Sequence, residues 1–251
     1  MRRQAVRLVS GTGIERAARS GYDAFRSLLP AAMLPVDEAK ARTYDRQTVE
    51  IASRVLPPNG NSIDAGAHCG GILRHLLKLS PEGEHWAFEP IPNLARQLRR
   101  RFPRARVEEV ALADFSGAAE FHFLPDAAAY SSLLNRADVE AGQPVRLLPV
   151  NVRRLDDVIP ADIPIALIKI DVEGAEAAVL RGAARLLQRH QPVVIFECAP
   201  AKLADCIPTL DSAGLRLYHP ADFLAGKRRQ LDEVMKLGLD RHEFYYVASS
   251  Q

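Results

Sequence analysis

The order of short apolar runs and amphipathic segments after residue 60 is the feature that most constrains the fold. The expected strands are residues 62–65, 85–90, 106–113, 165–172, 192–199, 215–218 and 243–248. The expected helices between them are residues 70–79, 93–102 and 174–190. Because parallel strands are joined by crossover connections, usually helices, this order predicts a parallel α/β sheet covered by helices on both faces.

Two stretches depart from this rhythm. Residues 1–56 have apolar positions three to five apart, which predicts an N-terminal helical extension ahead of a main domain at residues 57–251. The first 30 residues are rich in arginine, which suits a solvated helix face, an anionic membrane surface or a carrier protein. Between residues 117 and 152, two alternating segments predict antiparallel strands that enclose a polar loop and overhang the sheet.

Composition excludes several classes of protein. The 251 residues include 33 Lys plus Arg and 31 Asp plus Glu, a net charge of +2 that does not favour a nucleic-acid partner. The three cysteines lack the paired spacing of a zinc site or a disulfide framework, which favours a reducing compartment. No apolar stretch reaches the roughly 18–20 residues of a membrane span, and the apolar segment at the start is short for a signal peptide. We therefore expect a cytoplasmic protein without a transmembrane segment. The arginine-rich run at 96–106 is interpreted as a solvated helix face.

The most informative local motif is I-D-A-G-A-H-C-G-G at residues 63–71, where an expected strand ends in an acid and a glycine turn leads into a helix. Gly66 and Gly70 lack side chains where the chain must bend and where a ligand can lie against the backbone. The first amides of the following helix favour a negatively charged ligand group. The motif therefore predicts a ligand site at the end of the first strand.

Glu89 strengthens this prediction, because it lies 23 residues after Gly66, at the end of the next expected strand. Rossmann-like folds place an acid there to accept hydrogen bonds from ribose hydroxyls. A dinucleotide needs glycine at position 68 for close approach of its pyrophosphate, and His68 stands there instead. S-adenosylmethionine therefore fits better than NAD, since it offers a ribose to Glu89 and a carboxylate and an ammonium to the turn and to Asp64.

A third motif, I-K-I-D-V-E-G-A-E at residues 168–176, places Lys169 and Asp171 on one face of an expected central strand. Charged groups in such a strand must pair, bind a ligand or shift their pKa values, and the carboxyl edge of an open parallel sheet is where ligands bind. Glu197, near the end of the neighbouring strand, is an expected partner for Lys169. A purely structural ion-pair network is the alternative.

The chain resembles the FkbM family of S-adenosylmethionine-dependent methyltransferases over residues 48–199. The resemblance is carried by the segments D-A-G-A-H-C-G, F-E-P, V-A-L-A-D, I-K-I-D-V-E-G-A-E, L-R-G-A and I-F-E. It implies a Rossmann-like seven-stranded methyltransferase sheet that is mostly parallel, with an antiparallel last strand. It also implies O-methylation, with a hydroxyl of a sugar, polyketide or related secondary metabolite as acceptor.

The resemblance further implies roles for individual residues. Cofactor contacts are expected from Asp64, Gly66, Ala67, His68, Gly70, Glu89, Ala111, Leu112, Asp114 and Asp171. The glycine loop would contact the methionine end, Glu89 the ribose and residues 111–114 the adenine, while Asp171 would face the sulfonium. The family usually has Asn where this chain has His68, so either an imidazole contact replaces the amide or cofactor binding is weaker.

Methyl transfer from a sulfonium is an in-line displacement, so alignment of the acceptor oxygen with the methyl group supplies much of the catalysis. An alcohol also needs a base to remove its proton. We expect Asp171 to be this base, with Glu173 and His122 as the next candidates. The same carboxylates would instead suit Mg²⁺, which lowers the pKa of a hydroxyl, and no spacing decides between the two.

Two other functions are compatible with these motifs. His68 in the cofactor loop also suits a methyltransferase-fold binding or scaffold subunit that has lost turnover. N-methylation of an amine is the second alternative, because it needs less assistance from a base. The expected partner is a small-molecule or glycosyl acceptor, and the sequence leaves the oligomeric state open, a homo-oligomer included.

Overall fold

The computed structural model describes residues 36–125, 131–133, 144–241 and 244–251. Contacts divide the chain into two compact units, the first ending at Asp45 and the second running from Arg46 to Gln251. The helix α2 (Val36–Val55) runs across this division, and its last turns belong to the second unit. The expected helices before residue 36 lie outside the described residues.

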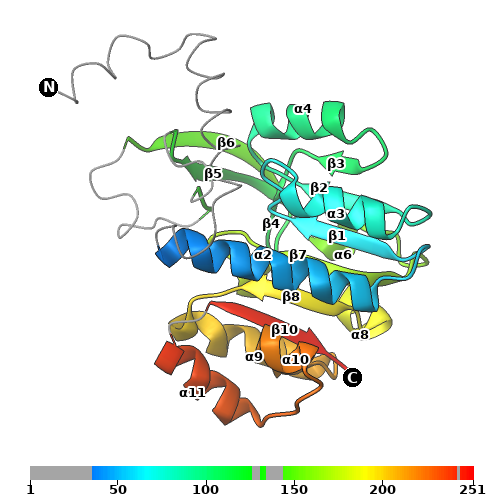
Figure 1. The fold of residues 1–251 in the computed structure, drawn as a ribbon. Helices are drawn as coiled ribbons and strands as arrows, with labels where there is room; N and C mark the ends of the chain where they lie inside the picture. The colour runs from blue at the N-terminus through cyan, green and yellow to red at the C-terminus, as the bar shows by residue number, and fades with distance from the viewer. Residues whose placement is uncertain (1–35, 126–130, 134–143, 242–243) are drawn as a thin grey trace, which may run out of the picture. The chain divides into compact units, whose positions relative to one another are not determined.

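The second unit is built on a seven-stranded sheet with the order β3-β2-β1-β7-β8-β10-β9 (Figure 1). Its strands are β1 (Asn61–Ala65), β2 (His85–Phe88), β3 (Arg106–Glu108), β7 (Ile165–Ile170), β8 (Val193–Glu197), β9 (Arg216–Tyr218) and β10 (Tyr245–Ser249). β10, the last strand, is antiparallel to both of its neighbours, whereas β3, β2, β1, β7 and β8 pair in parallel. The predicted sheet is therefore confirmed, including its antiparallel last strand.

Helices cover both faces of this sheet (Figure 1). They are α3 (Gly71–Leu79), α4 (Pro92–Arg101), α6 (Leu155–Val158), α7 (Glu176–Gly182), α8 (Ala184–His190), the 3₁₀ helix η4 (Pro200–Lys202), α9 (Leu203–Ser212), α10 (Pro220–Leu224) and α11 (Leu231–Arg241). Consecutive residues of β7 show how the faces divide, since Leu167 packs with Ile51 and Leu76 while Ile168 packs with Leu180. The strands are thus buried on both faces, as parallel strands usually are. Among the described helices, none is both long and apolar enough to cross a membrane.

A second, three-stranded sheet has the order β4-β6-β5 and is formed by β4 (Ala111–Leu112), β5 (Gly117–Phe123) and β6 (Arg146–Arg153). β5 and β6 are antiparallel, as predicted for residues 117–152. The prediction of one strand at residues 106–113 is wrong. The chain leaves the large sheet after Glu108, and Ala111 pairs instead with Val152 of β6.

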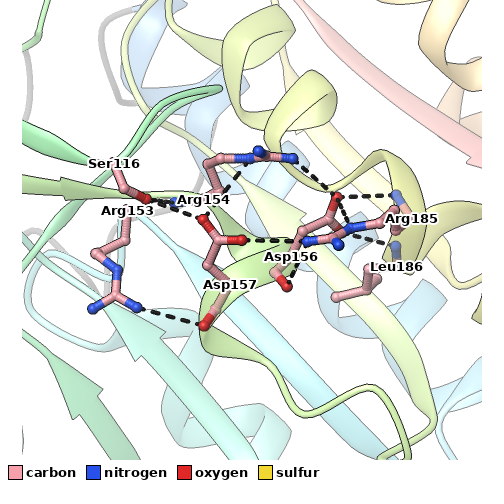
Figure 2. A network of polar contacts seen from close by, with 7 residues as sticks. All are labelled: Ser116, Arg153, Arg154, Asp156, Asp157, Arg185 and Leu186. Carbon is pink, nitrogen blue, oxygen red and sulfur yellow. Dashed lines mark hydrogen bonds and ion pairs between the residues drawn. The ribbon is translucent and has the colours of Figure 1, made fainter.

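The predicted helix at residues 174–190 is also wrong in its bounds. Glu173 and Gly174 have positive φ angles of 55° and 102°, so the helix begins only at Glu176, and it breaks at Ala183 into α7 and α8. Asp156 of α6 caps α8 from outside, because its Oδ1 accepts the amide of Leu186 at 2.9 Å and its Oδ2 accepts that of Arg185 at 3.1 Å. Figure 2 shows this cap together with the side chains that surround it.

We predict that Asp156→Ala lowers the free energy of unfolding by about 1–3 kcal/mol, because it leaves two amides at the start of α8 without an acceptor. Urea denaturation followed by circular dichroism measures this change. Asp157→Ala is the matched control. Its carboxylate contacts Ser116 and Arg185 at the surface (Figure 2), so a loss below about 1 kcal/mol is expected. Equal losses in the two variants would contradict the capping role.

Candidate active site

A cavity that is partly open to solvent lies at the carboxyl edge of the large sheet. Its lining comes from the loop after β1, the end of β2, the segment that includes β4, strand β5, residues 131–133 and the loop after β7. The lining residues are Gly66, His68, Phe88, Glu89, Pro90, Ile91, Val110, Ala111, Leu112, Phe121, Ser131, Leu133, Asp171, Val172, Glu173 and Ala175. Seven predicted site residues are thus brought together, namely Gly66, His68, Glu89, Ala111, Leu112, Asp171 and Glu173.

The two glycines of the β1 loop are required by contacts within the protein. Gly66 has a φ of +80°, and a Cβ there would lie 1.8 Å from the carbonyl oxygen of Asp171. Gly70 has a φ of +78°, and its Cβ would lie 2.3 Å from the ring of Phe102. The bend predicted from the motif is confirmed, but the groups that a side chain would strike at these positions are the chain's own backbone and core.

His68 and Glu89 fix each other across the cavity wall. The Glu89 Oε2 accepts the amide of His68 at 2.8 Å, and its Oε1 accepts the amide of Ile91 at 2.9 Å. Burial raises the pKa of Glu89, and these two hydrogen bonds oppose the rise. His68 has a φ of +46°, a conformation uncommon for residues other than glycine. A hydrogen bond to Cys69 raises the pKa of the His68 imidazole against the effect of burial, and the charges of Glu89 and Asp171 add to the rise.

Lys169 joins the ends of β1 and β7 beneath the cavity. Its Nζ lies 3.1 Å from Asp171 Oδ2 and 3.5 Å from Asp64 Oδ1, and it donates to the carbonyl oxygen of Gly66 at 3.3 Å. The contact with Asp64 is an ion pair. Burial raises the pKa of Asp64, and the charge of Lys169 opposes the rise. Lys169 also acts on Glu197, the partner expected from the sequence, because its positive charge opposes the raised pKa of Glu197.

Two further carboxyl groups lie near Asp171. Burial first, and the negative charge of Asp171 second, raise the pKa of Glu197 to about 7. Burial also raises the pKa of Glu176, although its Oε1 accepts the amide of Gly174 at 2.8 Å. These groups hold protons more strongly than ordinary glutamates, which limits the negative charge that accumulates around Asp171.

Residues 131–133 connect the small sheet to the loop after β7. The Ser132 Oγ donates to the carbonyl oxygen of Glu173 at 2.8 Å, and the Ser132 amide and carbonyl pair with those of His122 on β5. Leu133 and Ser131 line the cavity. The rest of the polar loop predicted between the two antiparallel strands, residues 126–130 and 134–143, lies outside the described residues.

Five predicted site residues do not line the cavity: Asp64, Ala67, Gly70, Asp114 and His122. The carboxylate of Asp114 is turned to Arg181, with Oδ2 2.8 Å from Nε. On β5 the cavity is lined by Phe121, and His122 follows it on the alternate side of the strand. The sequence did not reveal the apolar wall, because Ile91, Phe121 and Leu133 belong to no motif, and Phe88 and Val110 were given no role within F-E-P and V-A-L-A-D.

The carboxylates do not form a recognisable metal centre. Among the residues that the structure describes, no group of three or more His, Cys, Asp and Glu side chains is arranged to hold a metal ion. The expectation of Mg²⁺ is therefore without support.

We predict that Gly66→Ala destabilises the fold by about 2 kcal/mol or more, because its methyl group would strike the Asp171 carbonyl and the φ angle disfavours alanine. Thermal and urea unfolding measure the loss. Gly71→Ala is the matched control, since a Cβ there meets nothing within 4 Å and residue 71 lies in a helix. Wild-type stability in Gly66→Ala would show that this close approach is not required.

Comparisons with known proteins agree with this architecture. The sequence model of the methyltransferase FkbM domain matches residues 64–217, more than half of the chain. The 2-O-methyltransferase NoeI of Sinorhizobium fredii is 32% identical over 155 residues, which cover 56% of this chain and 64% of NoeI. Methyltransferase 1 of Beauveria bassiana is 26% identical over 175 residues, covering 61% of this chain and 69% of that protein. The chain thus spans just under two thirds of the length of NoeI.

Among solved structures, the methyltransferase FkbM of Methylobacillus flagellatus is similar with a TM-score of 0.50 and 17% identity. The match covers 80% of this chain and 50% of that one, and at this identity it reports on the fold alone. The family match rests on the sequence, and it includes the β1 loop, Glu89 and the segment around Asp171. The chain therefore belongs to the FkbM methyltransferase domain family.

Proposed function

We propose that the protein transfers the methyl group of S-adenosylmethionine to a hydroxyl of a small-molecule or glycosyl acceptor. The observation that carries the proposal is the position of Glu89, a buried carboxylate held by two backbone amides at the end of β2 and facing a cavity. Membership of the FkbM domain family supports methyl transfer. NoeI, whose name records 2-O-methylation, supports an oxygen acceptor.

The residues around the cavity fit S-adenosylmethionine. Each oxygen of Glu89 accepts one amide and keeps a further lone pair, which suits the hydroxyls of a ribose. Beside Glu89, the side chains of Ile91 and Leu112 give the cavity an apolar wall of the kind that holds an adenine. Asp171 lies on the wall formed by the loop after β7, and this is the proposed position for the charged sulfur.

The bound cofactor supplies an activated methyl group and a neutral leaving group. The chain's own residues have three tasks, which are to orient the cofactor, to exclude water and to receive a proton. The apolar wall contributes to the first two. As the acceptor oxygen forms its bond to the methyl carbon and the carbon–sulfur bond breaks, the hydroxyl proton passes to a carboxylate, for which we propose Asp171 Oδ1 or Oδ2. Glu173 is the second candidate on the same loop.

A binding or scaffold subunit without turnover is the competing proposal, and His68 favours it. The side chain at this position lines the cavity, and the residue has a strained backbone conformation. An imidazole there either contacts the cofactor or obstructs it. Binding of the cofactor discriminates between these outcomes without knowledge of the acceptor.

We predict that wild-type protein binds S-adenosylhomocysteine and not NAD, and that Glu89→Ala raises the Kd for S-adenosylhomocysteine at least about tenfold, because the ribose loses two charge-assisted hydrogen bonds. Isothermal titration calorimetry measures all three affinities. Glu108→Ala is the matched control, since Glu108 is an exposed acid at the end of the adjacent strand β3. If wild-type protein binds neither ligand, the scaffold proposal is favoured over the enzyme.

We also predict that Asp171→Asn reduces methyl transfer to a hydroxyl by about 100-fold or more at all accessible pH values, because an alcohol needs a base. The measurement is transfer of radiolabelled methyl from S-adenosylmethionine to a panel of sugars, other alcohols and amines. An amine above its pKa needs no base. Transfer to amines that Asp171→Asn leaves unchanged at high pH would replace the O-methyltransferase proposal with N-methylation.

A further inference from the structure

Lys169 is a buried cation next to the cavity that does not line it. Its side chain is 8% exposed, and its ammonium contacts the carboxylates of Asp171 and Asp64 and the carbonyl oxygen of Gly66. Of these, Asp171 and Gly66 are lining residues. Lys169 therefore acts on a cavity ligand only through its charge and through the groups that it holds.

The negative charge of Asp171 changes the pKa values of several neighbouring groups. It raises the pKa values of Asp64, Glu176 and Glu197, and it contributes to the raised pKa of His68. The same negative charge acts on a ligand bound beside Asp171, because Asp171 is one of the residues that line the cavity. The ammonium of Lys169 lies 3.1 Å from Asp171 Oδ2, on the side away from the cavity, and its positive charge opposes the negative electrostatic field of Asp171.

The two forms of the cofactor differ in charge at the point of reaction. S-adenosylmethionine carries a positive sulfur, whereas its product S-adenosylhomocysteine is a neutral thioether. A negative field at the sulfur stabilises the substrate form, and this stabilisation is lost as the methyl group leaves. Excess negative charge would therefore strengthen ground-state binding without accelerating the reaction.

We propose that Lys169 sets the preference of the pocket between the sulfonium and the thioether by offsetting the charge of Asp171. The proposal rests on S-adenosylmethionine being the ligand of the cavity. Lys169 is thus a positioning and charge-balancing residue rather than a catalytic one, because it acts on the ligand through Asp171. A lysine with a structural role alone would affect both forms of the cofactor equally.

The test measures the ratio of the Kd for S-adenosylhomocysteine to the Kd for S-adenosylmethionine, by calorimetry in the absence of an acceptor. Lys169→Gln and Lys169→Met remove the ammonium, so this ratio is expected to rise about three- to tenfold. Asp171→Asn removes the opposite charge from the same ion pair at constant volume, so the ratio is expected to fall by a similar factor. Lys78→Gln makes the same chemical change at an exposed position of α3 and is expected to leave the ratio unchanged.

The outcomes separate this proposal from the proposed function. If wild-type protein binds neither form, the proposed function fails. If both forms bind but the ratio stays at the wild-type value in the Lys169 variants, or both affinities weaken equally, the charge-balancing role is overturned. Removal of Lys169 leaves the buried Asp64 carboxylate and the partly exposed Asp171 carboxylate without the ammonium that they share, so circular dichroism first establishes that the variants fold. If they do not fold, Asp171→Asn decides, because an unchanged ratio there overturns the proposal by itself.

Discussion

The contact between the backbones that leave β1 and β7 is the constraint on which the candidate site depends. These strands are neighbours in the sheet, and Asp171 donates its amide to the carbonyl oxygen of Ala65 at 3.0 Å. Gly66 then passes so close to the Asp171 carbonyl that no side chain fits between them. As a result, the loop that precedes α3 and the loop that carries Asp171 form one continuous wall. Lys169 reinforces the junction from below, because it contacts both loops and the buried Asp64.

Much of the fold can be predicted from local patterns, because parallel strands that are buried on both faces appear in the sequence as short apolar runs. The predicted order of strands and helices is confirmed for the parts of the chain before and after the small sheet. The antiparallel last strand, which the family resemblance implied, is also confirmed. The prediction errors occur where the structure of a segment depends on a residue that is distant in the sequence. Apolar residues stand on both sides of Glu108 and Glu109 and suggest one strand over residues 106–113, but Ala111 pairs with Val152, which is remote in the sequence. Helix α8 begins where it does because Asp156 supplies acceptors from another element.

The site was predictable to the extent that charge and glycine mark it. Gly66, Glu89 and Asp171 stand out in the sequence, because an acid or a glycine at the end of a buried strand indicates a ligand site or a close backbone contact. The apolar wall has no such mark, since Phe121 reads as one more residue of an alternating strand. The side of a strand was equally hard to assign. His122 follows Phe121 and so lies on the other face of β5. Asp114 forms an ion pair with Arg181, and no local sequence pattern predicts this contact.

The cavity lies between two walls that different interactions hold in place. The wall formed by β1, β2 and β7 is fixed by strand pairing, by the Glu89 hydrogen bonds and by the Lys169 contacts. The facing wall comes from β5 and residues 131–133, and the side-chain hydrogen bond from Ser132 to the Glu173 carbonyl ties it to the loop after β7. Glu173 has a φ of +55°, so this bond also stabilises a backbone conformation that costs free energy. Strand pairing thus positions the residues proposed to bind the cofactor. The hydrogen bond from the Ser132 hydroxyl links the facing wall to the loop that carries Asp171.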